Sequence, residues 1–289
     1  MKYIDEKSPA KLNLILDVLD KREDGYHEIL SVMQTVFFCD VLRLTMTERK
    51  KITMSSNLDY LPNDGDNLCV RAAYLFFKTA EIKSSGLHIH AHKQIPVAAG
   101  LGGGSANAAA VLRALNRYHG NIFTMDELVA LAAKLGSDVP FCVRGGTQLA
   151  GGRGDVLEQL DPLPFCYVVL CKPQRKLSTA SVFARFSQEG KQVQPDVPGF
   201  LEALKRQDLA TCASLMQNAL ADEKLYEDLP DILGIMRDNG AFGAAMSGAG
   251  PTSFGLFESA EIAQVAARAL QRKYEGVFVT SVRGSVDAE

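Results

Sequence analysis

The alternation of apolar and polar positions marks the first strand of the chain. From Leu12 to Val18 every second residue is leucine or valine, and Lys11 and Asn13 have the opposite parity. Because successive side chains of a strand point to opposite faces, we predict a strand over residues 9–19 with Lys11 and Asn13 on one face. A lone lysine on a strand is ordinarily a solvated edge residue. Lys11 therefore has two interpretations, a functional group or a surface charge.

The same patterns predict a mixed chain of strands and helices. Period-two runs and short apolar runs indicate strands, whereas apolar residues spaced by three and four indicate helices. The pattern breaks at residues 161–164, so we predict an N-terminal lobe, residues 1–160, and a C-terminal lobe, residues 161–289. The predicted strands are 9–19, 32–38, 41–47, 51–55, 86–93, 165–171 and 277–282, with two short strands within 243–257 and one within 144–155. The predicted helices are 68–82, 105–118, 124–136, 199–206, 208–220, 228–239 and 259–273, with another opening near Ser178.

A glycine loop lies between the predicted strand 86–93 and the helix that begins at Ser105. It contains Gly100, Gly102, Gly103 and Gly104. Glycines allow backbone N–H groups to approach a ligand closely, and a helix N-terminus adds unpaired donors and a positive dipole end, so we predict a phosphate site. No Gly-Lys-Ser/Thr follows, and Ser105 stands where the dinucleotide fingerprint requires a glycine. The alternative interpretation is a flexible turn.

A carboxylate follows the predicted helix 124–136. Asp138 lies in the segment Gly136-Ser-Asp-Val-Pro-Phe141, beside a proline and among apolar residues. A carboxylate in such surroundings is costly unless it has a partner or a task, which makes Asp138 a candidate functional residue. Its other interpretation is a cap of a turn or helix.

Three histidines at alternate positions of the predicted strand 86–93 raise the question of a metal site. His88, His90 and His92 share a face, but no carboxylate or cysteine joins them locally. We therefore interpret them as a polar strand face and assign no metal ligands. The Arg-Gly-Asp sequence at 153–155 is interpreted as incidental.

Composition limits the classes of function. The chain has 289 residues, of which 47% are hydrophobic and 22% charged, as in ordinary globular proteins. A net charge of −3 without a basic stripe disfavours nucleic acid as a partner. No apolar run reaches membrane-spanning length and the first residues do not resemble a signal peptide, so we expect a cytoplasmic protein without a membrane partner. Six scattered cysteines predict reduced core thiols.

Three stretches together resemble a known family. Pro-Ala-Lys-Leu-Asn at 9–13, the glycine loop at 95–110 and Met-Ser-Gly-Ala-Gly-Pro-Thr at 246–252 are similar, in order and spacing, to the three motifs of the GHMP kinase superfamily. The resemblance implies an α+β fold in two lobes: an N-terminal lobe like ribosomal protein S5 domain 2 and a ferredoxin-like C-terminal lobe. It places the active site in the cleft between them.

The resemblance also implies an ATP-dependent kinase with residues in named roles. Lys11 and Asp138 match the catalytic lysine and aspartate, a pair in which the ammonium balances the carboxylate and can stabilise charge on the transferred phosphoryl group. Mg²⁺ is expected with ATP, without assigned protein ligands. The implied ATP-binding residues are Asn67, Lys93, Pro96, Gly100, Leu101, Gly102, Gly103, Gly104, Ser105 and Asn107.

Four further segments, at 22–27, 63–67, 136–141 and 178–183, resemble a superfamily member of non-mevalonate isoprenoid biosynthesis whose acceptor is a cytidine diphosphate derivative. This implies that the base stacks between Tyr26 and Phe183, while His27 reads its hydrogen-bonding edge. Aromatic faces hold a base without choosing it, and edge contacts supply the choice. Asn13 and Thr179 would contact the rest of the acceptor, in a monomer or homodimer.

Two other functions remain open at this point. The chain could be a GHMP kinase for another small alcohol, such as homoserine, mevalonate or a sugar, none of which offers a base to stack. It could also be a non-catalytic GHMP-fold sensor that retains the nucleotide loop. The presence of both Lys11 and Asp138 disfavours the sensor.

Overall fold

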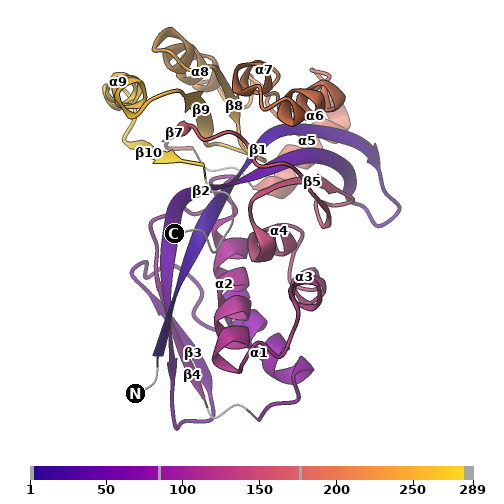
Figure 1. The fold of residues 1–289 in the computed structure, drawn as a ribbon, viewed down its shortest axis with the longest axis vertical. Coiled ribbons are helices and arrows are strands. Elements are labelled where there is room, and N and C mark those ends of the chain that lie inside the picture. The colour runs from indigo at the N-terminus through magenta and orange to yellow at the C-terminus, as the bar shows by residue number, and fades with distance from the viewer. Residues whose placement is uncertain (1–2, 84–85, 176–177, 283–289) are drawn as a thin grey trace.

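A computed structural model describes residues 3–83, 86–175 and 178–282 (Figure 1). The elements, in chain order, are β1 (Tyr3–Lys21), β2 (His27–Met46), β3 (Ile52–Ser56), α1 (Leu68–Thr79), β4 (Leu87–His92), α2 (Gly103–Tyr118), α3 (Met125–Ala132), α4 (Val139–Arg144), β5 (Thr147–Gly151), β6 (Val156–Gln159), β7 (Tyr167–Lys172), α5 (Thr179–Glu189), α6 (Val197–Lys205), α7 (Leu209–Ser214), α8 (Leu229–Asp238), β8 (Gly243–Met246), β9 (Ser253–Phe257), α9 (Ala260–Gln271) and β10 (Gly276–Ser281).

A long antiparallel ribbon of β1 and β2 runs through the molecule (Figure 1). The two predicted strands 32–38 and 41–47 are one strand, β2, so that prediction was wrong. The strand stays continuous because residues 39–41 pair with β1, while residues 31–34 also pair with β5 and residues 41–46 with β4. The predicted strand 9–19 is confirmed as the interior of β1. Its register shifts between Pro9 and Lys11 and again between Asn13 and Ile15.

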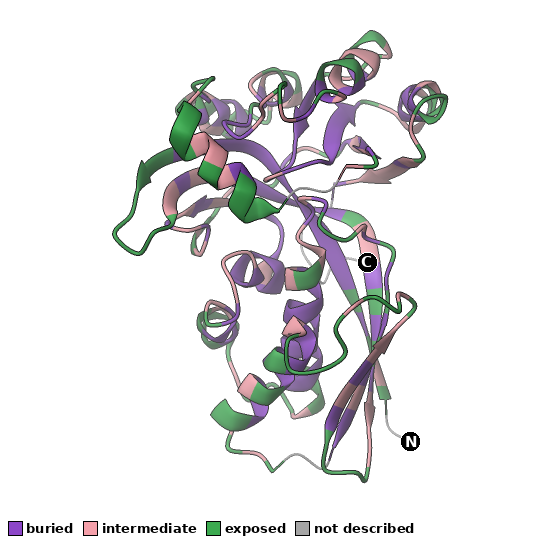
Figure 2. Cartoon of the chain, turned by 180° about the vertical axis from the view of Figure 1, so that it is seen from behind, coloured by how far each residue is buried: buried purple, intermediate pink, exposed green. Residues whose placement is uncertain are grey.

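The first sheet has the order β3-β4-β2-β5-β6, with β1 also paired to β2. Helices α1 to α4 lie on one side of it (Figure 1). The alanine-rich helix α2 has the largest number of buried residues among the four, and its apolar residues pack with β2, β4 and α1 in one core. Figure 2 shows this helix largely in the colour of buried residues. The position of the glycine loop is therefore fixed by a helix packed in the core.

The second sheet, of order β10-β7-β9-β8, lies over the upper part of the ribbon (Figure 1). Alternation in β7 shows how both of its faces are used. Val168 and Leu170 join the core shared with the ribbon, whereas Val169 and Cys171 join the core under α8 and α9. Two sheets with helices confirm the predicted α+β class. The strands of the first sheet all precede residue 160 and those of the second all follow it, while the lobe boundary itself stays a prediction.

Two element predictions need correction, and one helix was not predicted. Helix α4 begins at Val139, directly after Asp138, where Pro140 fits the first turn of a helix. The predicted helix 208–220 ends at Ser214. The chain then runs extended beside β1, where the Leu16 N–H donates to the Gln217 carbonyl (2.9 Å). The predicted helix 124–136 ends at Ala132.

The described residues also bear on the cysteines and on membranes. All six cysteines are free thiols, and five are buried. Burial raises the pKa of the Cys69 and Cys142 thiols to about 12, which keeps both protonated. Within the described ranges, none of the helices has the length and apolar character needed to cross a membrane.

Candidate active site

A single large cavity of about 960 Å³ brings the predicted site residues together. It lies between the ribbon, the glycine loop, α4 and α5. Leu101 is the one predicted residue that does not line it, because its side chain is buried in the core. The predicted residues that line the cavity are Lys11, Asn13, Tyr26, His27, Asn67, Lys93, Pro96, Gly100, Gly102, Gly103, Gly104, Ser105, Asn107, Asp138, Thr179 and Phe183.

The glycine loop approaches β1 so closely that a side chain would not fit. Gly102 is the N-cap of α2 in the left-handed conformation (φ 67°), and a Cβ there would stand 2.8 Å from Lys11 Cγ. The Lys11 N–H donates to the Leu101 carbonyl (3.0 Å). Among the described residues no side chain caps α2, so its first N–H groups face the cavity with the positive end of the helix dipole. This arrangement suits an anionic ligand.

Lys11 is buried and pairs with Asp138. Its Nζ lies 3.4 Å from Asp138 Oδ2 and donates a hydrogen bond to Asn13 Oδ1 (2.6 Å). The Lys11 side chain is 5% exposed, which rules out the surface-charge interpretation. Asp138 occupies the N-cap position of α4 but makes no side-chain cap bond. Its carboxylate, 33% exposed, is instead turned to Lys11 and the cavity.

The stretch 246–252 closes the site from the second sheet. Ser247 Oγ accepts from the Asn13 N–H (3.2 Å) and donates to the Gly100 carbonyl (3.0 Å). A Cβ at Gly100 would lie 2.2 Å from the Ser247 carbonyl oxygen. The third motif thus holds the glycine loop against β1. Sequence reasoning marked this stretch but did not single out Ser247.

A buried polar cluster lies behind the loop. The fully buried carboxylate of Asp40 in β2 pairs with Lys93 Nζ and accepts from Asn107 Nδ2 (2.8 Å). Its other oxygen accepts from the N–H groups of Gln94 (2.7 Å) and Ile95 (2.8 Å) at the start of the loop. Lys93 and Asn107 are therefore bound to Asp40 as well as facing the cavity. Asp40 was missed, because nothing near it in the sequence shows that its partners lie more than fifty residues away.

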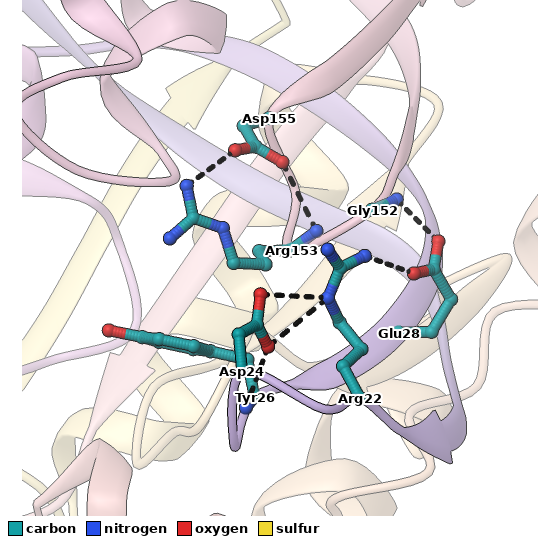
Figure 3. Close-up of polar contacts among 7 residues, drawn as sticks. All are labelled: Arg22, Asp24, Tyr26, Glu28, Gly152, Arg153 and Asp155. Atoms are coloured by element: carbon teal, nitrogen blue, oxygen red, sulfur yellow. Dashed lines mark hydrogen bonds and ion pairs between the residues drawn. The ribbon is translucent and has the colours of Figure 1, made fainter.

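The other end of the cavity is aromatic. The His27 ring stacks on Phe183, with centroids 5.4 Å apart, and His27 Nε2 lies 3.0 Å from Ser187 Oγ. Burial and the nearby charge of Lys21 lower the pKa of His27 below its usual 6.5. Tyr26, which is 55% exposed, also lines the cavity, and its ring lies under Arg153 (Figure 3). Thr179 is the first residue of α5, so it reaches the cavity beside Phe183.

Asn67 combines a structural contact with a place in the cavity wall. Its Oδ1 accepts from the Cys69 N–H (2.9 Å) and caps α1. Its Nδ2 donates to the Pro62 carbonyl (2.7 Å). These two bonds fix the loop that borders the cavity on the α1 side.

The histidine face of β4 is bonded within the sheet. His88 Nδ1 lies 2.9 Å from Thr53 Oγ1, and the Ser55 hydroxyl lies within 3.0 Å of ring nitrogens of His88 and His90. In the ranges that the structure describes, no three His, Cys, Asp or Glu side chains are grouped so that they could hold a metal ion.

Comparison with known proteins adds family information to this geometry. Residues 67–146 match the model of the GHMP kinases N terminal domain, and residues 200–276 match that of the GHMP kinases C terminal. The chain is 42% identical over 280 residues to 4-diphosphocytidyl-2-C-methyl-D-erythritol kinase of Exiguobacterium sibiricum, covering 96% of this chain and 97% of the relative. It is 43% identical over 281 residues to the enzyme of that name from Geobacillus kaustophilus, covering 96% of each.

Solved structures agree with this likeness. A crystal structure of 4-(cytidine 5'-diphospho)-2C-methyl-D-erythritol kinase superposes with a TM-score of 0.81 at 34% identity, covering 97% of this chain and all of that one. Homoserine kinase from Cytophaga hutchinsonii superposes with a TM-score of 0.79 at 22% identity, covering 98% of this chain and 95% of that one. The second likeness shows a common fold.

Proposed function

Because the chain belongs to the 4-diphosphocytidyl-2-C-methyl-D-erythritol kinase family within the GHMP kinases, we propose that it transfers the γ-phosphoryl group of ATP to the 2-hydroxyl of 4-diphosphocytidyl-2-C-methyl-D-erythritol. The products are the 2-phosphate and ADP, in non-mevalonate isoprenoid biosynthesis. One observation carries the proposal: the Lys11–Asp138 pair lies in the same cavity as the glycine loop and as Tyr26, His27 and Phe183.

ATP binds with its phosphates on the glycine loop and the first turn of α2. The residues proposed for ATP are Asn67, Lys93, Pro96, the loop from Gly100 to Ser105, and Asn107. Lys93 and Asn107 act from their bonds to Asp40, and Leu101 takes part through its backbone. Phosphoryl transfer needs positioning and charge stabilisation more than covalent chemistry by the protein, and a rigid cradle supplies the positioning.

Asp138 and Lys11 act on the acceptor hydroxyl. Asp138 orients the hydroxyl by accepting its hydrogen bond and is the group placed to take its proton. The hydroxyl oxygen forms a bond to the γ-phosphorus, and the bond from that phosphorus to the oxygen of ADP breaks. Lys11 sits 3.4 Å from Asp138 and under Gly102, so its charge can stabilise the transferred group.

Mg²⁺ accompanies ATP in this proposal. The Ser105 hydroxyl lines the cavity and is an oxygen donor of the kind that suits a hard cation carried mainly by phosphates. It would hold the ion together with phosphate oxygens. The ion would supply positive charge that balances the charge of the phosphates.

The acceptor's base binds at the aromatic end. Tyr26 and Phe183 offer faces for stacking, and His27, neutral at pH 7, offers one donor and one acceptor to the edge of the cytosine. Asn13 and Thr179 contact the remainder of the acceptor. Homoserine, mevalonate and sugars have no base to stack, so this end of the cavity favours the cytidine-bearing acceptor.

ADP release from Mg-ATP against a panel of acceptors tests the proposal. The panel contains 4-diphosphocytidyl-2-C-methyl-D-erythritol, methylerythritol phosphate, homoserine, mevalonate and galactose. We expect turnover with the cytidine-bearing compound alone. Turnover with another alcohol would overturn the assignment of the acceptor. No turnover with any compound, despite ATP binding, would favour the alternative of a non-catalytic sensor.

A further inference from the structure

Arg153 covers one face of Tyr26 at the mouth of the cavity (Figure 3). Its guanidinium carbon lies 5.2 Å from the centroid of the tyrosine ring. The two residues come from different turns: Tyr26 from the one between β1 and β2, Arg153 from the one between β5 and β6. Both line the cavity. A cation over an aromatic face is attracted by the ring quadrupole.

The arginine is held in place from its own turn. Its Nη2 donates to Asp155 Oδ2 (2.8 Å), and its backbone N–H donates to Asp155 Oδ1 (3.2 Å). Gly152, in the left-handed conformation, donates its N–H to Glu28 Oε1 (2.7 Å), which attaches this turn to β2. Arg153 is therefore presented to the ring by a fixed backbone.

The tyrosine is held from the other turn. Glu28 Oε2 accepts from Arg22 Nη1 (2.6 Å), and Arg22 Nε donates to Asp24 (3.1 Å). Asp24 in turn accepts from the Tyr26 N–H (3.1 Å). Figure 3 shows these hydrogen bonds and ion pairs, which tie Arg153 to Asp155 within one turn and join Gly152, through Glu28, Arg22 and Asp24, to the Tyr26 N–H of the other turn. The side chain of Tyr26 itself is 55% exposed, and the Arg153 guanidinium lies over its ring.

We propose that Arg153 is a positioning residue for the acceptor: it fixes the plane of the Tyr26 ring, so that the cytosine stacks on the face that Arg153 leaves uncovered. The proposal rests on the proposed function and adds a residue that was interpreted as part of an incidental Arg-Gly-Asp. Arg153 acts through Tyr26 and stays out of the reaction itself. Its loss should weaken binding of the cytidine-bearing acceptor and leave the chemistry on the bound acceptor unchanged.

Steady-state kinetics of Arg153→Met test this role. We expect KM for the acceptor to rise by about 3- to 10-fold, with kcat and KM for ATP within about twofold of wild type. Arg153→Lys keeps the charge but not the planar group, and we expect an intermediate KM. An unchanged or lower KM in Arg153→Met would overturn the proposal, because it would mean that the arginine only occupies the place of the base.

Arg43→Met is the matched control. Arg43 lies 4.4 Å over the ring of Tyr3 and pairs with Asp5, so it has the same kinds of contact outside the cavity. Its loss should leave KM for both substrates unchanged. A rise equal to that in Arg153→Met would show a general effect of losing such a pair and would also overturn the proposal.

A double-mutant cycle with Tyr26→Leu separates positioning from direct contact. If Arg153 acts through the ring, Arg153→Met should change KM for the acceptor by less than about twofold once Tyr26 is absent. If the two substitutions instead raise KM for the acceptor by factors that multiply in the double variant, Arg153 binds the acceptor by itself. Turnover of the cytidine-bearing acceptor by the wild-type protein tests the proposed function separately, so the two failures can be distinguished.

Discussion

Lys11 and Asp138 form the contact on which the proposed chemistry depends. We expect Asp138→Asn and Lys11→Met each to lower kcat by about 10²- to 10⁴-fold, the range for loss of a general acid–base or charge-stabilising group. ATP should still bind, because the glycine loop is held by Ser247 and Asp40. Single-turnover kinetics and calorimetric ATP binding provide the two measurements.

Asp126→Asn is the control for this pair. Asp126 is exposed and pairs with Arg144 away from the cavity, so its variant removes a carboxylate of the same size without touching the site. It should keep near-normal turnover. Near-normal turnover in both Asp138→Asn and Lys11→Met would contradict the roles given to them.

Sequence reasoning at this scale worked where the direction of a side chain depends on a local pattern. Strand alternation placed Lys11 and Asn13 on one face, and their side chains are in fact hydrogen-bonded. Asp40 and Ser247 could not be found in the same way. Asp40 lies in a mostly apolar part of β2, and its contacts are with loop amides and side chains that only the folded sheet brings to it. The residues of such a buried network do not recur at a regular spacing in the sequence, so no pattern marks them.

Among the elements, the junction of the glycine loop and α2 is the most tightly constrained. In Gly102→Ala the left-handed backbone would cost about 1–2 kcal/mol of stability, and the new Cβ would displace the stem of Lys11. We expect kcat to fall at least tenfold while the protein stays folded. Urea unfolding and steady-state kinetics measure the two effects separately.

Gly120→Ala separates backbone strain from contact with Lys11. Gly120 also has a positive φ (84°), but nothing lies within 4 Å of the position of its Cβ. This variant should lose similar stability with full activity. An equal loss of activity in both variants would mean that Gly102 matters for stability alone.

The elements also show where sequence patterns mislead. The helix at 259–273 and the strand at 86–93 were predicted within a few residues, since each has a clear period and clear ends. The helix was predicted over 208–220, but it ends at Ser214, because the apolar residues that follow pack along β1 in an extended segment. That choice depends on a strand some two hundred residues earlier, which no local window includes.

For the whole molecule, burial of histidines makes stability depend on pH. Burial lowers the pKa of His27, His88 and His119 below 6.5. The unfolded chain then binds more protons than the folded one between these lowered values and 6.5, so the free energy of unfolding falls as pH falls through that window. A carboxyl group with a lowered pKa, such as Asp231, changes the free energy of unfolding only near and below pH 3.8, which lies outside this window.

Urea unfolding at pH 7.5, 6.5 and 5.5 checks this expectation. The unfolding free energy should decrease at each step down in pH. His119→Gln should flatten the dependence, because His119 Nε2 is buried without a hydrogen-bond partner among the described residues. A free energy of unfolding that is flat or rises toward pH 5.5 would contradict the prediction.

The ribbon of β1 and β2 is synthesised long before the residues that cover its apolar side. Leu12 and Leu14 share a core with Phe200 and Phe254, residues that leave the ribosome far later. At a translation rate of about 5–20 residues per second, the apolar side of the ribbon remains uncovered for on the order of tens of seconds. Until the second sheet has emerged, the apolar side of the segment that carries Lys11 is therefore uncovered, and exposed apolar surface of this kind favours aggregation.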